Sequence, residues 1–252
     1  MVHRANASHI GGCLSIADLL AVLYGGVLRV DPARPDWPDR DRFVQSKGHA
    51  AAALYATLAD CGFFPTEWLD DYCQDGSRLY GHVTSPPVPG VEVSAGSLGH
   101  GLPIACGMAL AAKRDRRPTR TFALLSDGEL DEGSTWEAIL FAAHHRLDNL
   151  VAIVDYNKIQ SFGAVKDVLD LDPLADKWRA FRWGTREIDG HDTGLIGATL
   201  AAVPFEPGRP SVVIAHTVKG KGVSFMEHQL AWHYKSPNAE QLALALREIG
   251  AE

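Results

Sequence analysis

The chain has 252 residues, of which 46% are hydrophobic, and a formal net charge of −7 at pH 7. This length and composition can bury a large core as a single domain over residues 1–252. The acidic balance and the lack of a dense Lys/Arg run argue against a nucleic-acid surface, and no apolar stretch is long enough to span a bilayer. The four cysteines lack metal-ligand spacing, and no secretory leader opens the chain, so the cytoplasm is the expected location.

The amino-terminal half is expected to be mainly helical. Ser15 and Asp18 match a capping box ahead of an apolar run, so a helix is expected from about Ser15. A segment rich in Gly and Pro, 81–90, leads into a glycine loop at 96–101, and such connecting segments often carry function. Further helices in this half are expected at about 50–61, 66–73 and 102–113.

Strands and helices alternate from Thr121 onward. Short apolar runs predict buried parallel strands, and the periodic segments between them predict helices. The strands are expected at 121–125, 150–154, 184–188 and 212–215, and the helices at 135–145, 174–181 and 193–203. This alternation predicts an α/β fold with a doubly wound, mostly parallel sheet flanked by helices.

Polar residues follow two successive strands of that sheet. Ser126-Asp127-Gly128-Glu129 ends the first and Asp155-Tyr156-Asn157 ends the second. A right-handed crossover brings both carboxyl ends to one edge, so Asp127 and Asn157 can converge there. One carboxylate and one amide oxygen suit Mg²⁺, and the start of a helix just after Gly128 suits an anion, which together predict a metal-bridged diphosphate. Asp-Gly is also ordinary turn chemistry, so the dipeptide alone does not decide the matter.

The segment from Ser126-Asp127-Gly128 to Asn157 resembles the thiamine diphosphate motif, which begins with Gly-Asp-Gly and ends in an Asn-containing segment. The resemblance covers essentially the whole chain and is to the amino-terminal subunit of split bacterial transketolases. It is also carried, in chain order, by Ser8-His9-Ile10-Gly11-Gly12, Ser46-Lys47-Gly48-His49, Gly96-Ser97-Leu98-Gly99-His100-Gly101, Asp189-Gly190-His191-Asp192 and Lys219-Gly220-Lys221-Gly222. It implies the diphosphate-binding domain of the thiamine diphosphate fold.

The resemblance implies thiamine diphosphate and Mg²⁺ as cofactors. The residues it assigns to the cofactor are Gly96, Leu98, Asp127, Gly128, Glu129, Glu132 and Asn157. The metal would be held by Asp127, Asn157 and the backbone carbonyl of Ile159. Glu132 matches a glutamate near the subunit interface, although interaction with a helix dipole explains it equally well. Ser126 departs from the family's Gly, and we expect this to be tolerated because the metal ligand is Asp127.

Four histidines fall inside blocks that match the family, and the resemblance makes them catalytic residues near the reactive carbon and the diphosphate: His9, His49, His82 and His233. Imidazole donates or accepts protons near neutral pH, which suits work on hydroxyl and carbonyl groups. Each one alone would more often be structural. The residues after His82 depart from the family pattern, and His100 stands where transketolases usually carry Gln and has no assigned role. Three further histidines are interpreted as structural: His144, His145 and His216.

Two glycine-rich loops leave alternatives open. The loop at 96–101 lets the backbone approach a flat ligand closely, or it is only a tight turn before a helix. Lys219 and Lys221 could approach the diphosphate, but a solvated Gly-Lys-Gly loop is the favoured interpretation.

The implied activity is transfer of a two-carbon ketol unit from a ketose phosphate to an aldose, with the carbanion chemistry supplied by the cofactor. In the family, a glutamate that protonates the aminopyrimidine lies in a pyrimidine-binding domain with most sugar-phosphate ligands. That domain is expected here on a separate carboxyl-terminal subunit, in a heterotetramer. Two alternatives remain: a subunit of another thiamine enzyme, resembling 1-deoxyxylulose-phosphate synthase or a 2-oxoacid decarboxylase, and a non-catalytic cofactor-binding scaffold. The block at 1–6 usually follows a helix in this group, so a truncated or misassigned start is expected.

Overall fold

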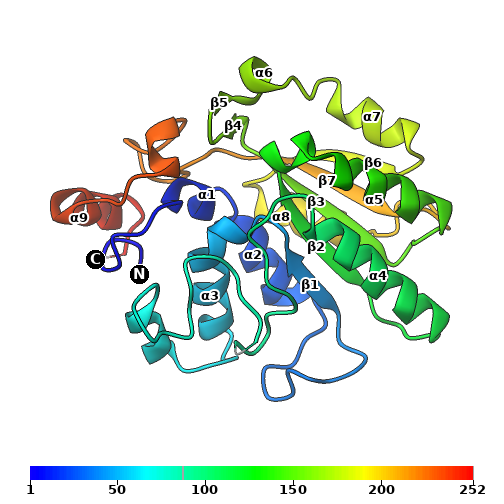
Figure 1. Ribbon diagram of the computed structural model, residues 1–252, viewed down its shortest axis with the longest axis horizontal. Coiled ribbons are helices and arrows are strands. Elements are labelled where there is room, and N and C mark those ends of the chain that lie inside the picture. Colours follow the sequence, from blue (N-terminus) through cyan, green and yellow to red (C-terminus); the bar gives the residue numbers. More distant parts are fainter. Residues whose placement is uncertain (87, 252) are drawn as a thin grey trace.

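The computed structural model describes residues 1–86 and 88–251, and its frame is a parallel sheet with the strand order β1-β2-β3-β7-β6 (Figure 1). The strands are β1 (Arg42–Gln45), β2 (Thr121–Ser126), β3 (Leu150–Tyr156), β6 (Gly184–Asp189) and β7 (Ser211–His216). Every neighbouring pair in this sheet is parallel, so all the carboxyl ends meet at one edge. The predicted meeting of the carboxyl ends of β2 and β3 at one edge is confirmed, and the two strands are direct neighbours, with Ser126 opposite Asp155 in the register.

Helices cover both faces of the sheet, which confirms the doubly wound prediction (Figure 1). One face carries α4 (Gly101–Arg114), α5 (Gly133–His144) and α7 (Leu174–Ala180), and the other carries α2 (Ala17–Val22), α3 (Ala51–Asp60) and α8 (Thr193–Ala201). The remaining α-helices are α1 (Ile10–Leu14), α6 (Val165–Val168) and α9 (Ala239–Glu248). Shorter helical turns lie at Leu23–Val27, Gly48–Ala50, Thr66–Asp71, Gly128–Asp131 and Leu230–His233.

Alternate side chains of the central strands pack into different cores. Phe122 and Leu124 belong to the core shared with α2, α3 and α8, whereas Ala123 and Leu125 belong to the core shared with α4, α5 and α7. All four side chains are fully buried. A strand covered on both faces must be apolar on both, which explains the continuous apolar runs in the sequence.

Several elements, among them β1, the β4–β5 hairpin and α9, are not predicted by the sequence. β1 is short and has only Phe43 and Val44 as apolar residues, so its pattern is too brief to mark a strand. The hairpin of β4 (Ile159–Gln160) and β5 (Gly163–Ala164) is shorter still. α9 does carry a sequence signal, since Asn238 and Gln241 form a reciprocal capping box at its start.

The capping role expected for Ser15 is wrong. α2 begins at Ala17 after Ile16, and no side chain caps it. The Ser15 hydroxyl is buried and donates instead to Gly12 O at 3.0 Å and to Asp155 Oδ2 at 2.7 Å. A hydrogen bond to a buried carboxylate is charge-assisted and therefore stronger than one accepted from a backbone N–H at a helix start, so the tertiary contact prevails. The helix expected at 66–73 is a 3₁₀ turn over Thr66–Asp71.

The amino-terminal segment lies beside the segment that leads into α9 (Figure 1). His3 Nδ1 lies 2.6 Å from Pro237 O, and Ser236 Oγ donates to Val2 O at 3.1 Å. Across residues 1–86 and 88–251, we find no helix with the length and apolarity needed to cross a membrane.

Candidate active site

A polar cavity of about 190 Å³ lies at the carboxyl edge of the sheet, where β2 and β3 end. Its walls come from segments that are far apart in the sequence and meet only in the fold. The residues that line it are His9, Lys47, His49, His82, Gly96, Leu98, Ser126, Asp127, Gly128, Asn157, Ile159, Gln160, Ser161, Lys219 and His233. Most of the site residues predicted from the sequence therefore line this one cavity.

Asp127 and Asn157 are held in place by backbone N–H groups at the two strand ends. Asp127 is 1% exposed and accepts hydrogen bonds from Gly128 N at 2.8 Å and Lys158 N at 2.6 Å. Asn157 Oδ1 accepts from Ile159 N at 3.1 Å, and its Nδ2 donates to Asp155 at 3.0 Å. Because Lys158 follows Asn157 directly, its bond to Asp127 ties the two strand ends together.

The oxygen atoms at this edge suit a hard divalent cation. Burial, and next the negative charge of Asp155, raise the pKa of Asp127 to about 6, although Lys219 and backbone hydrogen bonds oppose the rise. An adjacent cation would favour the charged carboxylate. Among the described residues, no group of three or more His, Cys, Asp or Glu side chains could hold a metal ion. Mg²⁺ does not require such a group, because it takes one or two carboxylates and completes its shell with phosphate oxygens and water.

Two buried lysines give the cavity its positive character. Lys47 is fully buried, and its Nζ donates to Gly12 O at 3.1 Å and to Asp155. Lys219 is 2% exposed, and its Nζ donates to Ile159 O at 3.0 Å. The solvated loop expected for Lys219 is therefore wrong, although Lys221 is exposed as expected. Burial, and next the charge of Lys47, lower the pKa of Lys219 to about 8.

The loop that carries Lys219 is drawn inward by a contact with the distant α1. Gly220 N donates to Gly11 O at 2.9 Å, and Gly220 has a φ of +79°. A Cβ at Gly220 would lie 2.4 Å from Met226 O, so only glycine fits this position. An ammonium group fixed in this way is suited to an anionic ligand.

The four histidines gather at one side of the cavity. The ring centroid of His9 lies 5.2 Å from that of His49, 5.6 Å from that of His82 and 5.0 Å from that of His233. His9 has a left-handed φ of +74°, and its backbone N donates to His233 O at 2.9 Å. A non-glycine residue in this conformation is held by its surroundings, which is common where a side chain must be aimed.

Most of these imidazoles are neutral near pH 7. Burial, and next the charge of a neighbouring group, lower the pKa of His9 to about 4 and that of His233 to about 3. Burial and then the charge of Lys47 hold the pKa of His49 well below its usual value. A neutral imidazole has one nitrogen that donates and one that accepts, so the cluster can hold or move a proton on a bound hydroxyl or carbonyl.

Glu129 and Glu132 do not line the cavity. Glu129 is fully buried and accepts hydrogen bonds from Ser46 Oγ, from Gly99 N at 2.9 Å and from Ser126 N at 3.4 Å. Glu129 therefore holds the glycine loop at 96–101 in place through Gly99 and does not face the cavity. Glu132 is exposed and lies beside that loop. A short 3₁₀ turn, Gly128–Asp131, follows Asp127, and the helix expected there begins only at Gly133.

The glycines of the loop at 96–101 have different roles. Gly99 has a φ of +80°, and a Cβ there would lie 2.4 Å from Ser134 Oγ. A Cβ at Gly101 would lie 2.2 Å from Ser46 Oγ. Tight packing before α4 explains these two glycines, whereas Gly96 and Leu98 face the cavity.

Sequence reasoning assigned no role to several residues that the structure places at the site. Lys47 belongs to one of the blocks that match the family, yet nothing in its neighbourhood showed that its ammonium would be buried. Asp155 follows the apolar run of β3, and such a charged residue in a buried strand is a usable signal, because it needs a partner. Gln160 and Ser161 belong to the β4–β5 hairpin, which the sequence did not reveal.

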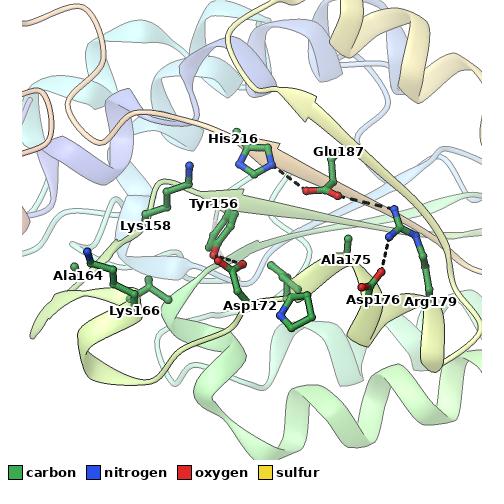
Figure 2. Close-up of a pocket in the computed structure, with 13 residues that line it drawn as sticks. Tyr156, Lys158, Ala164, Lys166, Asp172, Ala175, Asp176, Arg179, Glu187 and His216 are labelled. Atoms are coloured by element: carbon green, nitrogen blue, oxygen red, sulfur yellow. Dashed lines mark hydrogen bonds and ion pairs between the residues drawn. The ribbon is translucent and has the colours of Figure 1, made fainter.

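A second cavity, of about 820 Å³, lies near α7 and is shown in Figure 2. Several of its polar side chains pair with one another: Tyr156 donates to Asp172 at 3.1 Å, and Arg179 donates to Asp176 at 2.7 Å. His216 lies 3.2 Å from Glu187, which is consistent with the structural role expected for this histidine. Most of the charged members of this cavity are exposed to solvent.

The fold and the charged lining of the smaller cavity are typical of proteins that bind an anionic cofactor at the carboxyl edge of a parallel sheet. Residues 1–252 match the family described as transketolase, thiamine diphosphate binding domain. The chain therefore belongs to the transketolase family, as an amino-terminal, thiamine diphosphate-binding subunit of a transketolase that is divided between chains.

Relatives and solved structures agree with this assignment. The chain is 43% identical over 251 residues to a 6-deoxy-6-sulfo-D-fructose transketolase subunit of Clostridium sp., and the match covers 100% of this chain and 91% of that protein. It is 45% identical over 249 residues to an apulose-4-phosphate transketolase subunit of Phocaeicola vulgatus, with 99% and 88% covered. The transketolase of Leishmania mexicana superposes with a TM-score of 0.94 at 32% identity, covering 100% of this chain and 39% of that one. This chain thus spans about two fifths of that solved transketolase.

Proposed function

We propose that this chain holds the diphosphate and Mg²⁺ end of thiamine diphosphate in a two-subunit transketolase. The observation that carries the proposal is the convergence of Asp127, Asn157 and Lys219 on one cavity beside a cluster of histidines. Oxygen ligands for a hard cation and a buried ammonium for an anion are the two things that a metal-bridged diphosphate needs.

Different groups of the chain are assigned to different parts of the cofactor and its metal. Asp127 Oδ, Asn157 Oδ1 and Ile159 O are the oxygens we assign to Mg²⁺, and Lys219 is the cation we assign to the diphosphate. Gly96 and Leu98 line the same cavity from the loop before α4 and are assigned to the other end of the cofactor. When bound, thiamine diphosphate supplies the reactive carbon that takes up the two-carbon unit.

The histidines are assigned to the substrate's protons. His9, His49 and His233 carry lowered pKa values because they are buried near positive charges, so they are neutral at pH 7. Neutral imidazoles can hydrogen-bond a hydroxyl and take up its proton as the carbonyl forms. The hydrogen bond from His9 N to His233 O keeps these two residues side by side.

The cavity in this chain is half of a site. Its volume of about 190 Å³ lies below the roughly 300–1,000 Å³ typical of cofactor sites. Three exposed aromatic side chains lie within two positions in sequence of residues that line it, namely Tyr80, Phe162 and Tyr234. We infer that a carboxyl-terminal subunit covers this mouth and brings the glutamate and the sugar-phosphate ligands, within a heterotetramer.

The proposed substrates are a ketose phosphate or a similarly charged ketose as donor and an aldose as acceptor. The relatives' names concern 6-deoxy-6-sulfo-D-fructose and apulose-4-phosphate, both of which carry an anionic group on a sugar. Ketol transfer fits the site because it needs proton transfers at hydroxyl and carbonyl groups, which the neutral histidines can perform.

The proposed location is the cytoplasm. The four cysteines, Cys13, Cys61, Cys73 and Cys106, are free thiols. Disulfides persist in oxidising compartments, whereas free thiols suit a reducing one.

The test is a reconstitution of the two subunits. The chain would be produced alone and with the partner subunit, and ketol transfer would be assayed with thiamine diphosphate, Mg²⁺, a ketose phosphate and an aldose phosphate. We expect activity only in the mixture. Pyruvate offered as the donor should give none, and turnover by the isolated chain, or with pyruvate alone, would contradict the proposal.

A further inference from the structure

Asp155 is the centre of a buried hydrogen-bond network directly beneath the cavity. It lies near the end of β3 and is 0% exposed. Four side chains from separate parts of the fold donate to it: Lys47 Nζ, Thr217 Oγ1, Ser15 Oγ at 2.7 Å and Asn157 Nδ2 at 3.0 Å. Of these donors, Asn157 and Lys47 also line the cavity.

The contact with Asp155 decides which end of the Asn157 side chain is oxygen. An ionised carboxylate only accepts hydrogen bonds, so the group that faces it must be the NH₂ of the amide. The amide oxygen then points the other way, where it accepts from Ile159 N at 3.1 Å and keeps a second lone pair. Residues two apart on an extended strand lie on the same side, which is why Asp155 can reach Asn157.

Stability alone does not account for this arrangement. Lys47 and Asp155 form an ion pair whose side chains are 1% and 0% exposed. Removing both charges from water costs about as much as their attraction returns, so a buried pair is weak support for the fold. Groups that hold a metal ligand in place from behind, by contrast, commonly account for about 10- to 100-fold of metal affinity.

We propose that Asp155 is a positioning residue that fixes the Asn157 carboxamide with its oxygen toward the metal and diphosphate. This inference rests on the proposed function, since it concerns the same site. Asp155 does not touch the ligand. It acts through Asn157, and Lys47, Ser15 and Thr217 hold it in place.

The variant Asn157→Asp distinguishes the effect of the orientation of side chain 157 from the effect of its chemical type as a metal ligand. By ligand chemistry alone, a carboxylate should bind Mg²⁺ at least as well as an amide. In this network, however, the new carboxylate would face Asp155 without a donor between them, and like charges repel at that distance. We therefore expect Asn157→Asp to weaken Mg²⁺ binding by about 10- to 100-fold.

Exchanging the two residues should restore binding. In Asn157→Asp combined with Asp155→Asn, the new amide at 155 can donate to the new carboxylate at 157, and the total charge is unchanged. Asp155→Asn alone removes the acceptor-only partner and should also weaken Mg²⁺ binding by about 10- to 100-fold. The double variant should bind Mg²⁺ at least about tenfold more tightly than Asn157→Asp, because the two effects are coupled.

The experiment is a calorimetric titration of Mg²⁺ into the assembled two-subunit complex with saturating thiamine diphosphate. Thr121→Val is the matched control, since it removes a buried hydroxyl at the start of β2 that has no hydrogen-bond partner among the described residues, and it should shift the affinity less than about threefold. Melting curves for each variant report folding, and if Asp155→Asn alone does not fold, Asn157→Asp and the exchange decide the question. Wild-type affinity in Asn157→Asp, or an exchange that binds no better than it, would overturn the inference. A wild-type complex that does not bind Mg²⁺ and thiamine diphosphate would instead overturn the proposed function.

Discussion

Two of the cavities at the carboxyl edge of the sheet differ in how their charged groups are paired. The larger one, in Figure 2, has about 820 Å³, and its acids and bases pair mostly with one another in solvent. The smaller one has about 190 Å³, and its Asp127, Lys47 and Lys219 are almost fully buried. Size is therefore a poor guide to the site in this protein, and burial of charge is a better one.

The difference has a physical basis. An exposed ion pair such as Arg179 with Asp176 contributes little and neither needs nor specifies a ligand. A buried lysine or carboxylate is unfavourable unless the fold surrounds it with partners or a ligand supplies them. In the smaller cavity, such groups come together from several distant segments. A site preorganised in this way suits a charged cofactor.

Removing one carboxylate from each cavity tests most strongly whether only the smaller cavity binds the cofactor. Asp127→Ala should weaken thiamine diphosphate and Mg²⁺ binding to the complex by about 100-fold or more, since losing a direct ligand should exceed the roughly 10- to 100-fold of outer contacts. Asp172→Ala, in the cavity of Figure 2, should leave that affinity within about twofold. Calorimetry on the two variants gives the answer, and equal effects would remove the distinction between the cavities.

A second comparison uses two lysines of the same loop. Lys219→Met removes a buried ammonium from beside the proposed diphosphate and should weaken cofactor binding by about 10- to 100-fold, the value of a charged hydrogen bond. Lys221→Met changes an exposed side chain that lies 3.9 Å from Glu227 and should have almost no effect. A cofactor titration in which Lys221→Met matches Lys219→Met would show that general charge, and not the buried position, attracts the cofactor.

The histidines provide a pH test on the free chain. The pKa of His233 is lowered to about 3 by burial and then by the charge of Lys219, whereas the unfolded chain has the usual value near 6.5. Between pH 6.5 and about 3 the unfolded state binds a proton that the folded state does not, so His233 makes the fold less stable as pH falls.

His233→Asn should therefore reduce the acid-induced loss of stability between about pH 7 and pH 4. We expect a gain of about 1 kcal/mol at about pH 4 relative to the wild type, because the ring is only partly buried and solvent screens the effect. The exposed His144 is the matched control, and His144→Gln should keep the wild-type profile. Denaturant melts at the two pH values measure this, and parallel profiles for all three proteins would show that His233 titrates normally.

The smallest expected effect concerns Ser126, where the family motif has Gly. Ser126→Gly should lower the free energy of unfolding by about 0.5–1 kcal/mol, because glycine loses more chain entropy in a strand. Cofactor affinity should stay within about twofold, since Asp127 keeps its hydrogen bonds from Gly128 N and Lys158 N. A large gain or loss of affinity in the titration would mean that the hydroxyl takes part in binding.

Much of the fold could be predicted from the sequence because local patterns and topology agree. The apolar runs of β2 and β3 are unambiguous, and the handedness of the crossover places Asp127 and Asn157 at one edge. The strand β1 could not be predicted, since its four residues include only two apolar ones. α9 carries a local signal, since its capping residues Asn238 and Gln241 are visible in the sequence.

The features of the site that the sequence did not predict depend on contacts between distant segments of the chain. The burial of Lys219 depends on the contact of Gly220 with Gly11, which are separated by most of the chain, and no local pattern reports it. Ser15 was expected to cap a helix because capping is a local signal, yet it donates to Asp155 on a distant strand. Residue types and motif order thus located the site, while its buried network became visible only in the fold.

The most direct test of the central claim is to locate the metal. Crystals of the two-subunit complex grown with thiamine diphosphate and Mn²⁺ in place of Mg²⁺ would be measured for anomalous scattering. We predict a single strong peak between the Asp127 carboxylate, the Asn157 amide oxygen and the Ile159 carbonyl, next to the diphosphate. A cofactor bound elsewhere, or a peak remote from Asp127 and Asn157, would contradict the account.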